Sequence, residues 1–594
     1  MQINYKNRRL ERILIGSCVL AAAVVMASFV CFFGFFKPLL PVRILYGVQV
    51  ALLCIFIVEK MIRLFNAERK GEFLRANWLE IPLLIALGVV VFGAGRVVGE
   101  TRAVEVRHFA VGIYLVLQVV IKVCRTVVNL AASGKNPTQV LIASFVVLII
   151  SGAGTLCLPR AAATERLNFV DALFTATSAT CVTGLIVKDT GTDFSLMGQL
   201  IILSLIQLGG LGIVVFGAVF ALLLGQALTL RESVVMQDLL SARTLGRISS
   251  MIAFIFVGTI LFEFIGAISI FKMWDSIPTW TGSVQEQWFC SIFHSVSAFC
   301  NAGFSLFDDS FTAYSRSWGV YTVICPLIIL GGVGFGVLYD LANILADRVK
   351  RFFKKWFNVK YRFSMEAPRR MQLQTKIVLS VSAALIVLGA LGILLFERFA
   401  KSGGSAGNPG ILDALFQSIT ARTAGFNTIN VSAMSISSRF ILILLMFVGG
   451  SPGSTAGGIK TVTLAVVIMT AFAALRKRQE VEMFKRSIRI VVVGRAITVT
   501  LLFVAVLFAA SLVLSITEKT NGFSMADIMF ETGSALGTVG LTTGITGSLT
   551  TAGKLIIIAV MLIGRLGPLT LLAALTFNLK PVRYNYPGEA VIVG

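Results

Sequence analysis

Apolar runs of about 20 residues recur along this chain, and a helix of that length crosses the roughly 30 Å hydrocarbon core of a bilayer. Hydrophobic residues make up 56% of the 594 residues and charged residues only 14%. A soluble chain of this length would divide its apolar residues among short amphipathic segments. We therefore predict an all-α polytopic membrane protein in the lipid bilayer of the cell membrane. The first run, 13–36, is too long for a signal-peptide core and is expected to remain as the first span.

The chain carries a formal net charge of +23, which is distributed unevenly. Basic residues gather between the apolar runs, most densely in 60–75, 348–376 and 476–489. Positively charged loops stay on the cytoplasmic side of a membrane protein, which would place the N-terminus in the cytoplasm as well. The placement favours membrane orientation and contact with anionic lipid over nucleic-acid binding, so we expect no nucleic-acid partner.

An internal repeat begins near residue 137 and recurs at roughly 115–120 residues. Each unit has a long apolar helix, a short half-hydrophobic helix, a glycine-containing turn and a second long apolar helix. Four further apolar runs come first, at 13–36, 43–62, 79–98 and 107–128. The predicted domains are an accessory N-terminal bundle and four pore repeats, with the boundaries 1–136, 137–246, 247–350, 351–486 and 487–594.

The short helices cannot span the membrane, which favours re-entrant hairpins. Their sequences are DALFTATSATCVTGL, CSIFHSVSAFCNAGF, DALFQSITARTAGF and DIMFETGSALGTVGL. Two landmarks recur in all four, one residue closer together in the third: Phe174, Phe293, Phe416 and Phe530, then Gly184, Gly303, Gly425 and Gly540. Four hairpins around one axis would give a pseudo-fourfold arrangement with a water-filled centre, and about 12 full spans with about 4 half-helices in all.

Each turn ends in a glycine after small or polar residues, close to the T-V-G half of a potassium-channel filter. Glycine has no side chain to clash, so it can turn successive carbonyls toward a common axis. Carbonyl oxygens can replace the hydration shell of a monovalent cation, so K⁺ is expected at these carbonyls. Packing alone is the alternative, since small residues are common at membrane helix contacts. The predicted filter residues are Val182, Thr183, Gly184, Asn301, Ala302, Gly303, Thr423, Ala424, Gly425, Thr538, Val539 and Gly540.

Acidic residues flank these hairpins. Three of them stand at the starts of short helices and are expected to be N-caps, namely Asp171, Asp413 and Asp527. A cation-attracting mouth is a secondary role for the same carboxylates. It would be helped by further acids close to the turns, namely Asp189, Asp193, Asp308 and Asp309.

The segment GGSPGSTAGGIK interrupts the second long helix of the third unit with five glycines and a proline. We predict that this segment, within 447–460, is unwound below the filter, plugs the conduction path and moves aside, because glycines absorb dihedral changes at little cost. A kinked helix packed against its neighbours is the alternative. The predicted gate residues are Gly449, Gly450, Ser451, Gly453, Ser454, Thr455, Gly457, Gly458, Lys460 and Arg565.

Arg565 lies near the middle of the last apolar run, where a charge is expensive and usually functional. We expect it to face the pore cavity, to raise an electrostatic barrier there and to contact the gating segment. Snorkelling to the membrane surface is a poor explanation at this depth. Lys460 is ambiguous, because it also lies where a helix anchor would.

Enzymatic chemistry is not expected. Gly449–Gly453 matches G-x-S-x-G, but no soluble strand precedes it and only His108 and His294 exist for a triad. No P-loop or metal motif appears, so we expect no organic cofactor on this chain. Transport would draw on the membrane potential, about 2.3 kcal/mol per charge per 100 mV. A sodium-coupled symporter built on broken helices is the alternative.

The motifs TARTAGFN, GGSPGSTAGGIK and GRLGPLTL, with the four turns, resemble the Trk/Ktr/HKT superfamily of potassium transporters over roughly residues 137–594. The tail YPGEAVIVG is more similar to the Ktr membrane subunits. The resemblance implies a pseudo-fourfold pore in each protomer, a homodimer and a cytoplasmic ring of nucleotide-binding RCK-type regulatory subunits. By position it implies that the four turn glycines are filter glycines, that Gly449–Lys460 is a gating loop and that Arg565 is the pore arginine.

Within that superfamily, glycine in the first turn goes with potassium over sodium. A sodium-permeable member stays open as an alternative, and sodium stays a candidate activator. The chain departs from the family in the region 1–136. Arg107, Lys122 and Arg125 suggest a voltage-sensor-like bundle there, but a plain accessory bundle is favoured.

Overall fold

The computed structural model describes residues 6–71, 82–90, 137–163, 165–212, 248–276, 283–356, 369–399 and 409–568, with isolated residues between 107 and 118, at 215, 218, 219, 570 and 572. Most of these residues are helical, and the one sheet among them is a two-stranded hairpin. Among them, six helices are long and apolar enough to cross a membrane, and the bent pair α13 and α14 would make a seventh. The prediction of an all-α polytopic membrane protein is confirmed.

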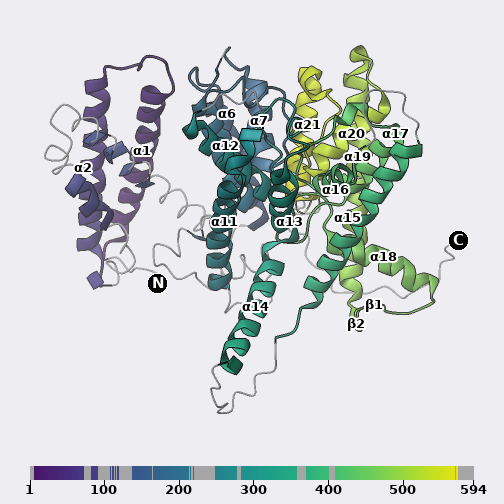
Figure 1. Cartoon of the computed structure of the whole chain (residues 1–594). Helices are drawn as coiled ribbons and strands as arrows, with labels where there is room; N and C mark the ends of the chain where they lie inside the picture. The colour runs from purple at the N-terminus through teal and green to yellow at the C-terminus, as the bar shows by residue number, and fades with distance from the viewer. Residues whose placement is uncertain are drawn as a thin grey trace, which may run out of the picture.

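Helices α1 (Arg8–Phe33) and α2 (Val42–Asn66) pack against each other at one side of the molecule (Figure 1). Their contact is built on buried apolar side chains, among them Val25 and Phe56. They correspond to the first two predicted N-terminal spans. The third and fourth predicted spans fall largely outside the described residues, as do Lys122 and Arg125.

In each of the first two repeats, a long helix is followed by a short helix and then by a further helix. Repeat one contains α6 (Pro137–Leu156), α7 (Phe169–Cys181) and α8 (Leu196–Leu211). Repeat two contains α11 (Ile248–Ile270), η2 (Phe271–Ser276), α12 (Val284–Cys300), the π-helical η3 (Val320–Ile324), α13 (Cys325–Val333) and α14 (Phe335–Trp356).

The last two repeats follow the same plan. Repeat three contains α15 (Leu373–Phe399), α16 (Ile411–Thr420), η4 (Val431–Ala433), α17 (Ile436–Phe447) and α18 (Thr461–Leu475), followed by the antiparallel hairpin β1 (Val481–Met483) and β2 (Arg486–Ile488). Repeat four contains α19 (Ile490–Thr517), η5 (Lys519–Asn521), α20 (Met525–Gly537), η6 (Thr546–Ser548) and α21 (Thr551–Leu566).

In every repeat the first long helix packs against the short helix that follows it: α6 with α7, α11 with α12, α15 with α16, and α19 with α20. The repeated phenylalanine of each short helix is fully buried, with 0% exposure at Phe174, Phe293, Phe416 and Phe530. Each short helix is therefore anchored by the same apolar side chain. This shared anchor places the four turns at equivalent positions.

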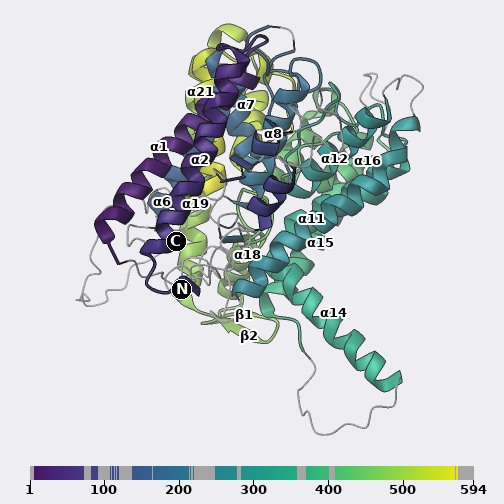
Figure 2. The same cartoon turned by 90° about the vertical axis from the view of Figure 1, so that its left-hand side faces the viewer.

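Helix α14 and the β1–β2 hairpin extend from the same end of the molecule (Figures 1 and 2). Helix α14 is bent by 103° from α13, and its far end exposes Phe352, Phe353 and Trp356. Basic residues accompany both elements, including Arg348 and Lys350 on α14 and Lys485 beside the hairpin. This arrangement agrees with one basic face outside the membrane.

The three predicted aspartate N-caps are wrong. The N-cap positions are Asn168, Gly410 and Ser524, and the aspartates lie three residues later, in the first turn of each helix. Their carboxylates instead bind the neighbouring repeat. Asp171 pairs with Lys554 of repeat four at 2.7 Å, Asp527 pairs with Arg439 of repeat three at 2.9 Å, and Asp413 accepts from Tyr321 of repeat two at 2.7 Å. These contacts fix three of the four short helices, α7, α16 and α20, to the repeat beside each of them.

Replacing Lys554 with alanine is expected to lower the free energy of unfolding by about 1–3 kcal/mol, between the values typical of exposed and of fully buried ion pairs. The two side chains are only 16% and 15% exposed, so Asp171 would lose its partner in a poorly solvated site. The matched control is Arg478→Ala, which breaks a pair that is 54% and 53% exposed. It should cost less than about 1 kcal/mol. Chemical unfolding in detergent provides the comparison, and equal losses would contradict an inter-repeat role.

Candidate functional site

The short helices end in a conformation that ordinary residues rarely adopt. Val182, Asn301 and Thr538 follow α7, α12 and α20 with φ of 57°, 58° and 50°, the left-handed region. Repeat three differs, because Ala421 remains right-handed and the positive φ of 82° comes at Thr423. The different cap agrees with the shorter third motif in the sequence.

A serine of each short helix holds the turn that follows in repeats one, two and four. Ser178 Oγ accepts from the amide of Gly184, and Ser534 Oγ accepts from the amide of Gly540, both at 3.1 Å. Ser297 Oγ donates to the carbonyl of Phe304 at 2.8 Å. In repeat three, where threonine replaces this serine, the carbonyl of Thr420 accepts from the amide of Ala424 at 2.9 Å. The turns are therefore held by their own short helices.

The four turn glycines form a closed ring. All four have positive φ, of 91°, 71°, 81° and 95° in chain order. A Cβ atom added at each one would come within 3.0 Å of a carbonyl oxygen of the next repeat. In order around the ring, the pairs are Gly184 with Ala302 O, Gly303 with Ala424 O, Gly425 with Val539 O and Gly540 with Thr183 O. The structure therefore brings all four predicted turns together, and each position requires glycine both for its φ and for space.

Threonine side chains close to this ring are buried without a partner. The hydroxyls of Thr183, Thr423 and Thr538 are inaccessible, and no atom of the described residues bonds to them. No group of three His, Cys, Asp or Glu side chains that could hold a metal ion occurs among the described residues. The ring thus offers neutral oxygens, a donor set suited to a monovalent cation.

The glycine-rich segment between α17 and α18 is an irregular loop beneath the ring. The ends of the loop meet in a short parallel bridge between Val448 and Ile459. Three backbone hydrogen bonds attach the loop to repeat two: Ser451 N to Gly332 O at 2.9 Å, Phe335 N to Gly453 O at 2.9 Å, and Thr455 N to Gly331 O at 3.4 Å. The loop is therefore docked on the point where α13 ends.

The same loop touches two of the turns. Thr455 Oγ1 lies 3.3 Å from the side-chain amide of Asn301, the residue that ends α12. A Cβ atom added at Gly457 would collide with the side chain of Thr538. Lys460 turns back into the loop, where its Nζ donates to Ala456 O at 2.7 Å. The loop thus lies directly against the turns of repeats two and four.

Arg565, in the last turn of α21, reaches across to two other repeats. Its Nη1 donates to the carbonyl of Thr455 in the loop. Its Nη2 donates to Gly209 O at 2.5 Å and to Gly210 O at 3.3 Å, at the end of α8 in repeat one. One guanidinium therefore links repeats one, three and four below the ring of glycines.

The family described as TrkH, Cation transport protein, matches residues 106–581. The chain belongs to the TrkH family of cation transport proteins. Helices α1 and α2 lie outside the matched TrkH-family region. The chain is therefore a multi-pass membrane protein of a transporter family.

Two curated relatives align with this chain over nearly their whole length. The Ktr system potassium uptake protein B of Bacillus subtilis is 37% identical over 463 residues, which cover 77% of this chain and 97% of that protein. The potassium/sodium uptake protein NtpJ of Enterococcus hirae is 35% identical over 466 residues, with coverage of 77% and 97%. The crystal structure of the potassium transporter TrkH from Vibrio parahaemolyticus matches with a TM-score of 0.58 at 18% identity, covering 85% of this chain and 97% of that one. The structural match supports the fold.

Three helix breaks of this TrkH-family chain were not predicted from its sequence. The second long helix of each repeat is interrupted at the same place, in the sequences LGGLG, LGGVG, VGGSPG and IGRLG. Gly212, Gly334 and Gly567 follow α8, α13 and α21 with φ of 79°, 94° and 84°. A Cβ atom added at Gly209, Gly331 or Gly564 would collide with the backbone at the end of its own repeat's short helix. The internal repeat is the sequence feature that could have predicted these breaks. In the same alignment, Arg565 stands where repeats one and two have Gly210 and Gly332.

Proposed function

We propose that this chain is a potassium uptake pathway whose selectivity filter is formed by the four turns. The observation that carries the proposal is the closed ring of glycines and neighbouring carbonyl oxygens. Four short helices direct their C-terminal ends, which carry partial negative charge, toward that ring and favour a cation there. The unpaired hydroxyls of Thr183, Thr423 and Thr538 support the same proposal, because buried polar groups without partners are costly unless a ligand or water binds them.

Potassium is the proposed ion for two reasons. The two relatives described above are named for potassium uptake and for potassium/sodium uptake. In addition, the superfamily resemblance associates glycine in the first turn, Gly184, with potassium over sodium. The name of the Enterococcus hirae relative favours one alternative, a pathway that also admits sodium.

The glycine-rich loop is the proposed gate, and Arg565 is its latch. The loop lies against the turns of repeats two and four, and Arg565 binds the carbonyl of Thr455 within it. A guanidinium at this position also repels a cation electrostatically. Opening would require the loop to leave the end of α13, and its glycines allow that change of dihedral angles.

We also propose a homodimer with a cytoplasmic RCK-type regulatory ring and a cytoplasmic N-terminus. Two relatives, from Bacillus subtilis and Vibrio alginolyticus, are both named Ktr system potassium uptake protein B. The name describes each of them as one protein of a system. The far end of α14 offers a surface for such a ring, since Phe352 and Trp356 are 60% and 73% exposed beside basic residues. Aromatic and basic side chains are common at protein interfaces.

Potassium uptake can be tested in cells that lack their own uptake systems. Expression of the full chain should restore growth at low external potassium, and the same chain without residues 1–136 tests whether the N-terminal region is needed. Purified protein in liposomes should then show channel-like flux that follows the voltage. Saturable flux that requires sodium in fixed stoichiometry would instead support the symporter.

Acidic external pH is expected to slow uptake at low potassium. The neighbouring Asp189 carboxylate raises the pKa of Asp308, and each aspartate follows its turn glycine by five residues. Asp308 therefore loses its charge at a higher pH than an ordinary aspartate does, and a less negative mouth attracts fewer cations. Asp189→Asn should shift the midpoint of the pH profile to lower pH. An unchanged midpoint would rule out this pair as the source.

A further inference from the structure

Each short helix carries a buried polar residue directly after its anchoring phenylalanine. The four residues are Thr175, His294, Gln417 and Glu531, and none is more than 1% exposed. Burying a polar side chain costs free energy unless hydrogen bonds replace those to water. What each of the four binds therefore shows whether it has a role beyond packing.

In repeat four, this residue attaches α20 to the segment after the turn. The two carboxylate oxygens of Glu531 accept from the hydroxyls of Thr542 and Thr546. Thr542 lies two residues after the ring glycine Gly540. Hydrogen bonds to a carboxylate are about twice as strong as those between neutral groups, so this attachment is firm.

In repeat two, a histidine makes the same attachment. His294 Nδ1 lies 2.8 Å from the carbonyl oxygen of Cys290, which can only accept, so Nδ1 carries the proton and Nε2 is an acceptor. Nε2 lies 3.1 Å from Ser305 Oγ and accepts from the amide of Leu306 at 3.3 Å. Ser305 lies two residues after the ring glycine Gly303, the same spacing as in repeat four. Two unrelated side chains therefore hold the same position after their turns.

Repeats one and three lack this attachment among the described residues. Thr175 Oγ1 donates to Asp171 O within its own helix at 3.0 Å. Both polar atoms of the Gln417 amide are buried without a partner in the described part of the chain. Two positions after the ring glycines, these repeats have Ile186, which has no polar group, and Asn427, whose side chain bonds within its own loop.

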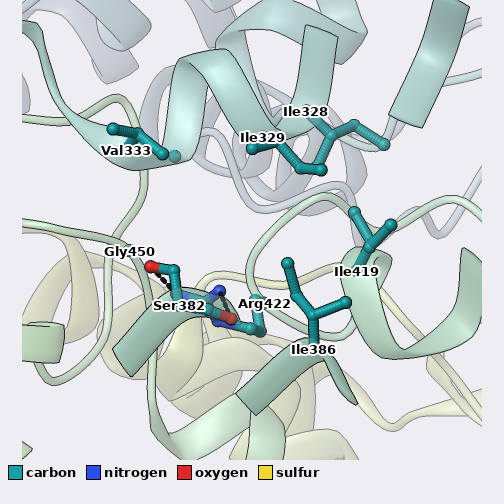
Figure 3. A pocket seen from close by; sticks show the side chains of 9 residues that line it. Ile328, Ile329, Val333, Ser382, Ile386, Ile419, Arg422 and Gly450 are labelled. Atoms are coloured by element: carbon teal, nitrogen blue, oxygen red, sulfur yellow. Dashed lines mark hydrogen bonds between the residues drawn. The ribbon is translucent and has the colours of Figure 1, made fainter. Parts of the chain in front are cut away.

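The third turn is instead held at its start. Arg422 directly precedes the turn, and its Nη2 donates to the hydroxyl of Ser382 on α15 at 3.2 Å (Figure 3). This bond fixes the end of α16 and not the segment after the turn.

The two attached turns face each other, and they are the turns that the loop touches. The ring follows chain order, so repeats two and four lie on opposite sides of it. Thr455 of the loop lies against Asn301, and Gly457 lies against Thr538. The loop therefore contacts the start of each of these two turns, and the attachment holds the segment after it.

We propose that Glu531 and His294 are positioning residues of the selectivity filter. By holding Thr542 and Ser305, they keep the turns of repeats four and two at the spacing that fits dehydrated potassium when the loop docks or leaves. Each acts through the segment after its turn and not by binding the ion. This inference rests on the proposed filter and assigns its width in part to two side chains outside the ring.

The first test is the ratio of potassium to sodium flux in liposomes. Glu531→Ala should lower the ratio about tenfold, the effect expected when a buried charge-assisted hydrogen bond is lost. Glu531→Gln keeps one acceptor oxygen and should lie between Glu531→Ala and the wild type. His294→Phe keeps an aromatic ring in place and should lower the ratio about threefold, because the lost bonds join neutral groups.

Gln417→Met is the matched control, because it changes the equivalent residue of repeat three, where no bond to the segment after the turn is lost. It should leave the flux ratio unchanged. Thr542→Val removes the partner of Glu531 with little change of shape, so it keeps the test valid even if Glu531→Ala does not fold. The double variant should lose less than the sum of the two single losses, since both remove one shared bond. Additive losses, or an equal loss in Gln417→Met, would overturn the proposal.

Ion binding separates a positioning role from a general loss of stability. The unfolding temperature of the purified full chain in detergent is measured over a series of potassium and sodium concentrations. The potassium concentration that gives half of the stabilisation should rise about tenfold in Glu531→Ala and Thr542→Val, with the sodium value unchanged. A lower unfolding temperature with the wild-type potassium value would mean a merely structural role and would overturn the proposal. A wild-type chain without potassium preference in either assay would instead contradict the proposed filter, so the two failures are distinguishable.

Discussion

Gly540→Ala is expected to reduce the preference for potassium over sodium at least tenfold, which corresponds to about 1.4 kcal/mol of ion discrimination. The new methyl group would collide with the carbonyl of Thr183 in the neighbouring repeat and push the ring apart. A widened ring fits a dehydrated potassium ion less well, so sodium with part of its water can enter. Gly540→Ser and Gly184→Ser should act in the same direction. The measurement is the ratio of potassium to sodium flux into liposomes.

Gly544→Ala is the matched control for this substitution. Gly544 has the same φ of 95° as Gly540, but nothing lies within 4 Å of an added Cβ atom there. Both variants therefore carry the strain of a non-glycine residue in the left-handed region, typically 1–3 kcal/mol. Only Gly540→Ala also disturbs the ring. If both variants changed the flux ratio equally, selectivity would depend on general strain and not on the closeness of the turns.

Arg565→Ala is expected to raise the basal potassium flux at least tenfold. The substitution removes the hydrogen bonds that join Thr455 of the loop to Gly209 and Gly210 of repeat one, together with a positive charge below the ring. Arg565→Gln separates these two effects, because an amide can still donate to one carbonyl but carries no charge. Flux through Arg565→Gln between that of the wild type and that of Arg565→Ala would assign part of the barrier to each.

Deleting glycines from the 449–458 loop should also raise the basal flux, because the shortened loop cannot stay attached to Gly331 and Gly332. Liposomes loaded with a potassium-sensitive dye report this flux without any regulatory subunit. A fully closed pore in the loop variant, or an Arg565→Ala chain with unaltered flux, would contradict the assignment of a gate and a latch.

The membrane fold was predictable because its signals are long and repeated. The length of the apolar sequence alone predicts spans such as α15 and α19, which have 27 and 28 residues. The fourfold repeat adds the short helices, whose anchoring phenylalanines recur in the sequence and are all buried. The closed ring was predictable in outline for the same reason, since a glycine repeated at four matched positions indicates a shared backbone constraint.

Contacts between repeats could not be predicted from local patterns. An aspartate near a helix start usually caps that helix, yet Asp171 and Asp527 find their partners in Lys554 and Arg439 of other repeats. Nothing near either aspartate in the sequence identifies these partners. The same limit applies to Arg565, whose acceptors Gly209 and Gly210 lie more than 350 residues earlier.

The missed helix breaks have a different cause. LGGLG and LGGVG lie inside continuous apolar runs, where two or three glycines are common in membrane helices. Only the longer third segment, with its proline and lysine, stood out from its surroundings. Alignment of the four repeats on their filter glycines would have identified the other three breaks. It would also have shown that Arg565 replaces a glycine.

The central claim is that the four turns bind one dehydrated monovalent cation on their shared axis. Crystals grown with thallium or rubidium in place of potassium test it most directly, because the anomalous signal locates the ion without assumptions about the protein. The account predicts a peak inside the ring of Gly184, Gly303, Gly425 and Gly540, which sodium does not produce. A ring that stays empty while the ion binds elsewhere in the chain would contradict it.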